Sequence, residues 1–381
     1  MSVDYGARLE RVRAQMDRLG IELIYLPPGA NWQWLLGLRR ERPAYTAILY
    51  PGGWLYGAFV GLERGPILAL PRMVAEFDLP TLPGVEARVL PDRGDPDALL
   101  REILAMFSLR RRTVAVEDRA WAVFLLHLQR ELPGATVSVA SEIFSPLRVV
   151  KDDHELTLMR RAAELTDQVM GDVLPRLRVG VSELEILTEI DYQLARRGAE
   201  ATSFPTSLYV INPRRPGAMV EVKGRSTHPI EPGTAVPFDF GAVWEGYCSD
   251  FGRTVWVGEP PAEYRRTHDL VMTAQAAGIA ALRAGARAED ADHAARRIID
   301  NAGYGAGFRH RLGHGIGMDV HEPPFLTSGD TTVLRPGMCF TVEPSIILDD
   351  RWMVRVEDVV VVRDGGGESL NAFPHDLLVV A

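Results

Sequence analysis

Residues 236–254 read VPFDFGAVWEGYCSDFGRT, and most of what the chain reveals about itself connects to this stretch. Apolar residues alternate with small or polar ones on both sides of Glu245-Gly246, which predicts a β-hairpin with its turn at that dipeptide. We expect Asp239 and Asp250 near the open ends of its two strands. Carboxylates held in this way can converge on one point, where they repel each other unless a cation lies between them. A surface hairpin can also carry two aspartates, so the rest of the sequence has to decide.

Composition restricts the class of protein. A chain of 381 residues suggests two domains of about 100 to 200 residues each. The content of 46% hydrophobic and 24% charged residues is ordinary for a globular protein. A net charge of −9 argues against a nucleic-acid partner, which would need a basic surface. The two cysteines, Cys248 and Cys339, have no CxxC partner, so we expect reduced thiols and a cytoplasmic protein.

Membrane and export signals are not expected. The N-terminal segment lacks the apolar core of a secretory signal. Residues 44–62 form an uncharged stretch about as long as a membrane span, but Pro51-Gly52-Gly53 interrupts it. A buried hairpin around this turn is the better interpretation.

Residues 1–150 are expected to form an α/β domain. Apolar residues at spacings of three and four predict a first helix that ends at Gly20, and a strand follows at 21–26. Trp32 and Trp34 either line a pocket or, more commonly for large side chains, belong to the core. No glycine-rich nucleotide motif is present. Further strands are predicted at 46–50, 67–70, 87–90 and 113–116, and further helices at 98–107 and 119–132.

The charged segment SPLRVVKDD, residues 145–153, is expected to join this domain to a second one, residues 151–381. A long helical pattern covers 155–174. Ser182 and Glu185 form a capping box that opens another helix, which Gly198 ends.

The second domain contains signs of an internal repeat. Arg178, Gly180 and Gly198 around one predicted helix recur as Arg283, Gly285 and Gly303 around another, each at an offset of 105. The same offset carries Asp239 and Asp250 to positions beside Glu343 and near Glu357, on two strand-like runs at 339–348 and 352–362. A duplicated helix-helix-hairpin unit would therefore present two aspartates and two glutamates across a pseudo-twofold axis.

Residues 310–324, HRLGHGIGMDVHEPP, lie between the two hairpins. Glycines at 313, 315 and 317 flank His314, and we expect them to let the backbone approach a ligand closely. A single histidine in a loop is usually a structural hydrogen-bonding residue. With four candidate carboxylates nearby, His314 is more plausibly a metal ligand.

The motifs FDFG…GYCSDFGRT, GHGIGMDVHEPP, TVEPSI and VRVED, in this order, resemble the metal-dependent M24 peptidases of the aminopeptidase P and prolidase branch. The resemblance implies a creatinase-like α/β N-terminal domain followed by an α+β pita-bread catalytic domain with an internal pseudo-twofold duplication. It also implies cleavage of Xaa-Pro peptides, as an Xaa-Pro dipeptidase or aminopeptidase, by a hydroxide that bridges two metal ions. A homodimer is expected on the same ground.

The resemblance extends to single residues. It implies a dinuclear site with Asp250 and Glu357 as bridging ligands, Asp239 completing one ion, and His314 with Glu343 completing the other. Such an oxygen-rich set with one imidazole suits Mn²⁺, Co²⁺, Fe²⁺ or Zn²⁺.

The resemblance also implies catalytic roles. Glu343 would act as general acid and base. His321 would hydrogen-bond the substrate or intermediate, and Arg355 would order the site or hold a substrate carboxylate. Arg355 as an ordinary exposed strand residue is the alternative. His310 matches a recurrent histidine that we regard as supportive and not catalytic.

One family feature is missing. Active relatives usually carry a further histidine upstream of the first aspartate, whereas residues 205–224 contain none and place Arg214 and Arg215 there. Loss of such a donor can cost about 2.7 to 4 kcal/mol of barrier. An M24-fold enzyme with a small non-peptide substrate therefore stays open, through creatinase-like or ectoine hydrolase-like carbon-nitrogen hydrolysis or a sulfonium lyase reaction. A catalytically silent binding protein is a third alternative, less favoured because no metal ligand is lost.

Overall fold

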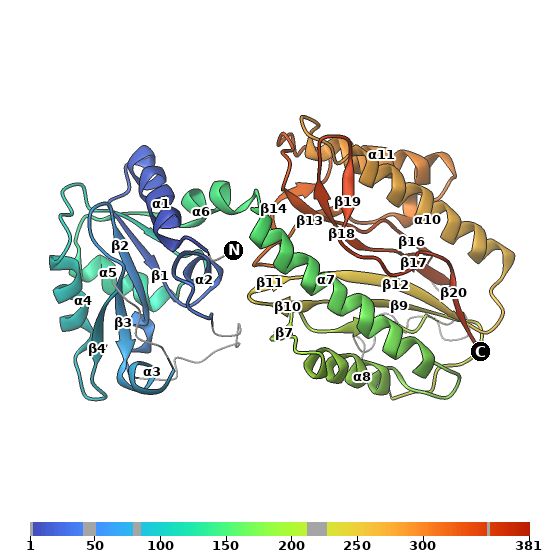
Figure 1. Ribbon diagram of the computed structural model, residues 1–381, viewed down its shortest axis with the longest axis horizontal. Coiled ribbons are helices and arrows are strands. Elements are labelled where there is room, and N and C mark those ends of the chain that lie inside the picture. Colours follow the sequence, from blue (N-terminus) through green and yellow to red (C-terminus); the bar gives the residue numbers. More distant parts are fainter. Residues whose placement is uncertain (1–2, 41–50, 79–84, 212–226, 349–350) are drawn as a thin grey trace. The chain divides into compact units, whose positions relative to one another are not determined.

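The computed structural model describes residues 3–40, 51–78, 85–211, 227–348 and 351–381. The chain forms two compact units, Met1–Arg148 and Val149–Ala381 (Figure 1). The strand predicted at 46–50 lies outside the described residues. No helix among the described residues is long and apolar enough to cross a membrane.

The first unit is an α/β domain whose mixed sheet has the strand order β4-β3-β2-β1-β5-β6. Strand β1 pairs antiparallel with β2 and parallel with β5. The strands are β1 (Leu23–Leu26), β2 (Gly57–Gly61), β3 (Ile67–Pro71), β4 (Glu86–Leu90), β5 (Thr113–Val116) and β6 (Thr136–Val139). The helices are α1 (Tyr5–Leu19), α2 (Ala30–Leu36), α3 (Arg72–Phe77), α4 (Pro96–Ala105), α5 (Ala122–Glu131) and α6 (Ser141–Arg148).

Several local predictions in this unit agree with the structure, and one needs correction. Helix α1 ends at Gly20, which adopts the left-handed conformation with φ 70°. Trp32 and Trp34 are fully buried, so the core interpretation is the right one. Residues 145–148, expected in a charged joint, instead finish helix α6, because Ile143 and Phe144 give this segment a buried apolar face.

The second unit places helices along both sides of its strands (Figure 1). The helices are α7 (Asp153–Val173), α8 (Glu183–Arg196), α10 (Ala262–Ala281) and α11 (Ala288–Asn301). The longer strands are β9 (Thr234–Phe240), β12 (Phe251–Val257), β14 (Glu322–Leu326), β15 (Cys339–Val342), β16 (Ser345–Leu348), β17 (Trp352–Arg355) and β18 (Asp358–Val362). The shorter strands are β7 (Ala201–Thr202), β8 (Ser207–Leu208), β10 (Ala242–Trp244), β11 (Tyr247–Cys248), β13 (Gly313–Gly315), β19 (Gly367–Ser369) and β20 (Leu378–Val380).

The internal repeat is present in the backbone hydrogen bonds. Gly180 N donates to Ile230 O, and Gly285 N donates to Leu334 O, both at 2.9 Å. In the reverse direction, Ile230 N donates to Val181 O at 2.7 Å, and Leu334 N donates to Ala286 O at 2.8 Å. The glycines have φ of 90° and 82°, a conformation that favours glycine. Each repeat also has its own core, one around α7, α8, β9 and β12 and one around α10, α11, β15 and β18.

The hairpin at 236–254 differs from its prediction. Its outer strands β9 and β12 pair in one sheet, whereas β10 and β11 belong to another, so the chain changes sheets at Gly241 and again at Asp250. A Cβ on Gly241 would lie 2.1 Å from Ser249 O, so only glycine allows this crossing. Asp239 and Asp250 consequently lie where the hairpin divides and not at its open ends. The second repeat divides in the same way, with β15–β18 in one sheet and β16–β17 in another.

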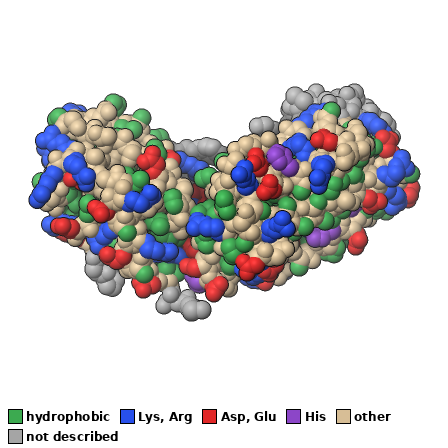
Figure 2. All heavy atoms as spheres, turned by 90° about the horizontal axis from the view of Figure 1, so that it is seen from above, with side chains coloured by type: hydrophobic (Ala, Val, Ile, Leu, Met, Phe, Trp, Pro, Cys, Tyr) green, Lys and Arg blue, Asp and Glu red, His purple; other side chains and the backbone are tan. Residues whose placement is uncertain are grey.

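Charged side chains are mixed on the surface. Figure 2 shows Lys and Arg interspersed with Asp and Glu on one face, so neither sign dominates the described part of that face. This distribution agrees with the acidic composition and its modest net charge of −9.

Candidate metal centre

Asp250 and Glu357 occupy equivalent places in the two repeats. Asp250 directly precedes β12, and Glu357 directly precedes β18. An antiparallel bridge between Gly252 and Glu357 joins the repeats at this point. Both carboxylates are almost fully buried, at 4% and 2% exposure. The chain duplication therefore brings one acidic side chain from each half to the same buried position.

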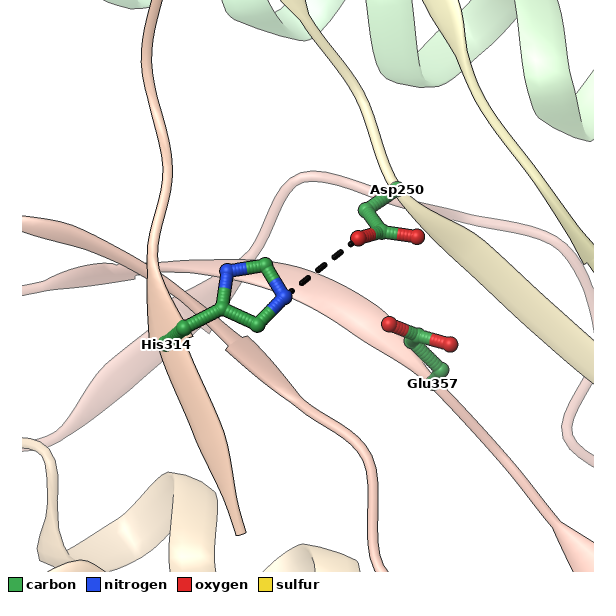
Figure 3. Close-up of side chains that lie close together, drawn as sticks. All are labelled: Asp250, His314 and Glu357. Atoms are coloured by element: carbon green, nitrogen blue, oxygen red, sulfur yellow. Dashed lines mark ion pairs between the residues drawn. The ribbon is translucent and has the colours of Figure 1, made fainter. Parts of the chain in front are cut away.

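His314 completes a compact group with these two residues (Figure 3). It lies on β13, between β14 and β15. One ligand atom from each of Asp250, His314 and Glu357 lies within 4.8 Å of the others. The His314 Nε2 atom is 3.5 Å from Asp250 Oδ2. Among the described residues, this trio has the spacing of a metal site.

Glu343 lies at the edge of this trio, in the break between β15 and β16. Its Oε1 atom is 3.6 Å from His314 Nε2. Thr341 links both residues, because its Oγ1 donates to Glu343 Oε1 at 3.2 Å and accepts from His314 N at 3.1 Å. The backbone N–H of Glu343 donates to Leu312 O at 2.9 Å. The side chain of Glu343 therefore faces the trio from a fixed backbone.

Asp239 is bound by Arg355. Arg355 Nη2 is 2.8 Å from Asp239 Oδ2, and Arg355 Nε is 3.5 Å from Glu357 Oε2. Arg355 is buried, with 8% exposure, so it is not an ordinary surface residue. Thr254 Oγ1 fixes its backbone by accepting from Arg355 N at 2.9 Å. The structure thus places Arg355 between two of the predicted ligands.

The electrostatics of the site are unfavourable without a cation. Burial, reinforced by neighbouring carboxylates, raises the pKa of Asp250 and raises the pKa of Glu357 well above its usual value. Burial also raises the pKa of Glu343 to about 7. Burial lowers the pKa of His314, but Asp250 and Glu343 outweigh it, so that pKa is raised. Several carboxylates share a water-poor site and resist losing their protons.

A divalent cation fits these residues. Asp250 Oδ1 is buried and accepts no hydrogen bond within the described structure, and buried Glu357 Oε2 has only the ion pair with Arg355 Nε at 3.5 Å. Orphaned buried oxygens of this kind are costly unless a donor or a metal ion meets them. Carboxylate oxygens with one imidazole are suitable ligands for first-row divalent ions. The donor set and its carboxylate oxygens without hydrogen bonds therefore match a metal centre.

The other predicted histidines lie close by. His321 is exposed, and its ring packs edge-on against His314 with 4.1 Å between centroids. His310 Nε2 lies 2.6 Å from Ser345 Oγ, and its Nδ1 lies 2.7 Å from Arg311 O. Protein atoms therefore contact both ring nitrogens of His310, which agrees with a supporting role.

The glycines around His314 allow close packing inside the protein. A Cβ on Gly313 would lie 1.9 Å from Thr341 O, and one on Gly315 would lie 2.4 Å from Glu322 O. A Cβ on Gly317 would lie 2.8 Å from Glu322 Oε2. These glycines therefore allow neighbouring chain segments to approach closely, and the expected approach to a ligand stays a prediction.

Two structural features near the site were missed from the sequence. Thr341 stands two residues before Glu343, and the two-residue period of a strand predicts side chains on one face at this spacing. The pair Lys151 and Glu322 is remote in sequence and gave no signal. Arg214 and Arg215, which raised the question of the substrate, lie outside the described residues.

Comparison with known proteins connects the site to a family. Residues 157–364 match the model of metallopeptidase family M24, and residues 8–150 match the creatinase/prolidase N-terminal domain. An Xaa-Pro dipeptidase of Lactobacillus delbrueckii subsp. lactis is 40% identical over 72% of this chain and 74% of its own.

Solved structures extend the likeness to the whole chain. A recombinant prolidase from Thermococcus sibiricus covers all of both chains with a TM-score of 0.89 at 29% identity. An Xaa-Pro dipeptidase from Bacillus anthracis covers 99% of this chain and all of its own, with a TM-score of 0.85 at 27% identity. The expected two-domain creatinase-like architecture is confirmed.

Proposed function

Because this chain belongs to metallopeptidase family M24, we propose that it is a metal-dependent dipeptidase that cleaves Xaa-Pro dipeptides. The observation that carries the proposal is the meeting of Asp250, His314 and Glu357 at one buried point, where two carboxylate oxygens accept no hydrogen bond. The Xaa-Pro specificity rests on the relatives of that name. The chain spans the whole length of the solved relative from Bacillus anthracis.

We assign five ligands to a pair of divalent ions. Asp250 and Glu357 would be the ligands shared by the two ions, as the family resemblance implies, and the bridge between Gly252 and Glu357 brings their strands together. By the same resemblance, Asp239 would complete one ion, and His314 with Glu343, which lie beside each other, would complete the other. When bound, two such ions supply an activated water and stabilise the charge that develops on the scissile carbonyl oxygen. Mn²⁺, Co²⁺, Fe²⁺ and Zn²⁺ are the candidates for the donor set.

Glu343 moves the proton in this proposal. Its carboxylate accepts a hydrogen bond from Thr341 and lies beside the trio, with a pKa near neutrality in the metal-free protein because of burial. A carboxylate in this position can take up a proton from water and release it again to a leaving group. Glu343 therefore accepts the proton of the attacking water and passes it to the leaving prolyl nitrogen.

Arg355 and His321 have different tasks. The guanidinium of Arg355 contacts Asp239, Glu357 and the Phe238 carbonyl. We therefore assign Arg355 to ordering the ligands and not to binding the substrate carboxylate. His321 is exposed next to His314, where its ring can donate a hydrogen bond to the bound peptide.

The test is hydrolysis by metal-free protein reloaded with Mn²⁺ or Co²⁺. The panel contains Xaa-Pro dipeptides, longer Xaa-Pro peptides and matched Xaa-Ala dipeptides, with Glu343→Ala as the control. Release of proline that disappears in the variant, with Xaa-Ala peptides left intact, supports the proposal. Full metal occupancy without turnover of any peptide would overturn it and direct the search to small carbon-nitrogen or sulfonium substrates. A protein that takes up no metal would favour a silent binding protein.

We also propose a homodimer in the cytoplasm. The dimer follows from the family resemblance, and the mass in solution by light scattering tests it. The cytoplasmic assignment is supported by Cys248 and Cys339, which are buried free thiols. Detection of the protein in an exported fraction would contradict it.

A further inference from the structure

A buried ion pair stands directly beside His321. Lys151 Nζ lies 3.2 Å from Glu322 Oε2, and the two side chains are only 3% and 10% exposed. Lys151 precedes helix α7, and Glu322 opens strand β14, immediately after His321. The two residues are 171 positions apart in the sequence. A charged pair in such a place needs an explanation, because burying charges seldom improves stability over apolar residues of similar size.

Glu322 closes the loop that carries His321. Its Oε1 accepts a hydrogen bond from Asp319 N at 3.1 Å, while its Oε2 reaches Lys151. Both carboxylate oxygens therefore hold the segment, one from within the loop and one from outside it. Because Glu322 is the next residue after His321, fixing its side chain also limits where the backbone of His321 can lie.

The start of the same loop is hydrogen-bonded to the hairpin 236–254, which carries Asp239 and Asp250. Cys248 N donates to Gly317 O at 2.8 Å, and Cys248 Sγ approaches Met318 O at 3.4 Å. Cys248 lies two residues before Asp250 in the sequence. The loop 316–322 is thus fixed at its beginning by the hairpin and at its end by Lys151.

The backbone of the loop lies close to this ion pair at Gly317. A Cβ at this position would lie 2.8 Å from Glu322 Oε2 and 2.9 Å from Lys151 Cε. The backbone of the loop therefore passes so close to the ion pair that a larger residue here would displace the ends of both side chains. Lys151 is itself anchored, since its N–H donates to Gly337 O at 2.9 Å.

We propose that Lys151 and Glu322 are positioning residues for His321. They hold the loop so that the His321 ring stays packed edge-on against His314, 4.1 Å away, and can meet the bound substrate. The inference rests on the proposed function for the substrate contact of His321. The positioning itself is a property of the protein without substrate.

A double-mutant cycle tests the catalytic side. Glu322→Gln keeps an acceptor for Asp319 N but removes the charge that Lys151 needs. Displacement of a substrate-contacting residue, here His321, is expected to lower kcat/KM by roughly tenfold to a hundredfold. If Glu322 acts through His321, Glu322→Gln has no further effect once His321→Ala is present. Equal losses in both backgrounds would overturn the proposal, because they would show a general structural role.

Two more variants keep this experiment decisive. Lys151→Met leaves the Glu322 charge buried without its partner and can unfold the protein. The double variant Lys151→Met/Glu322→Gln is therefore also made, because Glu322→Gln removes that charge. The double variant is expected to lose activity to the same extent as Glu322→Gln alone. Arg160→Met, which breaks the exposed pair of Arg160 with Glu368, is the matched control and is expected to keep full activity. Metal content measured for each variant has to stay at the wild-type level.

Amide hydrogen exchange separates this inference from the proposed function. In metal-loaded protein without substrate, residues 316–322 exchange faster in Glu322→Gln than in the wild type, and Arg160→Met leaves them unchanged. Unchanged exchange in Glu322→Gln would overturn the positioning role whatever the substrate is. Faster exchange in a protein that cleaves no Xaa-Pro peptide would retain the positioning role and refute only the substrate assignment.

Discussion

Gly252 and Glu357 exchange two backbone hydrogen bonds, Gly252 N to Glu357 O at 3.3 Å and Glu357 N to Gly252 O at 2.9 Å. These bonds join the two repeats at the point where the acidic side chains meet. Arg253 strengthens the junction, because its Nη1 donates to Gly252 O at 2.8 Å and to Glu357 O at 2.9 Å. The position of Glu357 relative to Asp250 therefore depends on how closely the two strands can approach each other.

Gly252→Ala is expected to weaken metal binding. The new Cβ would lie 2.8 Å from Glu357 Oε2 and 3.2 Å from Arg355 Nε, so the Glu357 carboxylate has to move. We expect metal affinity to fall by roughly tenfold or more, the usual cost of disturbing a ligand's surroundings. Calorimetric titration with Mn²⁺ measures it. Gly171→Ala, at an open position on helix α7, is the control and should bind metal normally. Equal affinities in the two variants would contradict the argument.

Removal of Arg355 is expected to destabilise the metal-free protein. Arg355→Met leaves Asp239 without its partner at 2.8 Å, in a site already rich in negative charge. Breaking a buried pair from one side costs about 3 to 5 kcal/mol. Urea denaturation of protein stripped of metal by a chelator measures the free energy of unfolding. Arg355→Lys keeps the charge but not the forked geometry, so its loss should be smaller. A stable Arg355→Met variant would show that this pair contributes little.

Thr341→Val tests the link between His314 and Glu343. The substitution keeps the shape of the side chain but removes the acceptor for His314 N and the donor to Glu343 Oε1. An unsatisfied buried N–H group costs about 1 to 3 kcal/mol, and the freed Glu343 should also lower kcat. Denaturation and peptide turnover are measured together. Thr341→Ser retains the hydroxyl and should recover most of both quantities. Loss of function in Thr341→Ser equal to that in Thr341→Val would argue against the hydrogen bonds.

Stability of the metal-free protein is expected to fall as pH rises. Burial raises the pKa of Glu357 and brings that of Glu343 to about 7, whereas both groups titrate near 4.5 in the unfolded chain. Between these values the folded protein binds more protons than the unfolded one, so the free energy of unfolding decreases with pH. One full proton corresponds to about 1.4 kcal/mol per pH unit. His314 contributes in the same direction, because its pKa is also raised.

The prediction is measured by thermal unfolding, between pH 5 and 7.5, of protein stripped of metal by a chelator. The melting temperature should decrease across this range, and Glu343→Gln should flatten the decrease. Bound metal should reverse the trend, since it requires deprotonated carboxylates and binds more tightly as pH rises. A metal-free protein whose stability increases with pH, with the same slope in Glu343→Gln, would show that these carboxylates are not buried as described.

Local sequence determined the parts of the fold that depend on neighbouring residues. The capping box of Ser182 with Glu185 was predictable, and it is present with both hydrogen bonds. The glycine stops at Gly20 and Gly198 were also predictable, because a positive φ is needed there and glycine supplies it. The offset of 105 revealed the repeat, since two copies of one unit keep their turn residues in register.

The sequence by itself also determined the chemistry of the centre, because carboxylates and an imidazole in ordered motifs indicate a divalent metal. Tertiary structure alone decided which strands pair, since the alternation in 236–254 continues through Gly241 while the chain passes to another sheet. It also decided that Arg355 binds Asp239 and that Lys151 meets Glu322. Pairing between distant segments depends on the packing of the whole domain, and no local pattern encodes it.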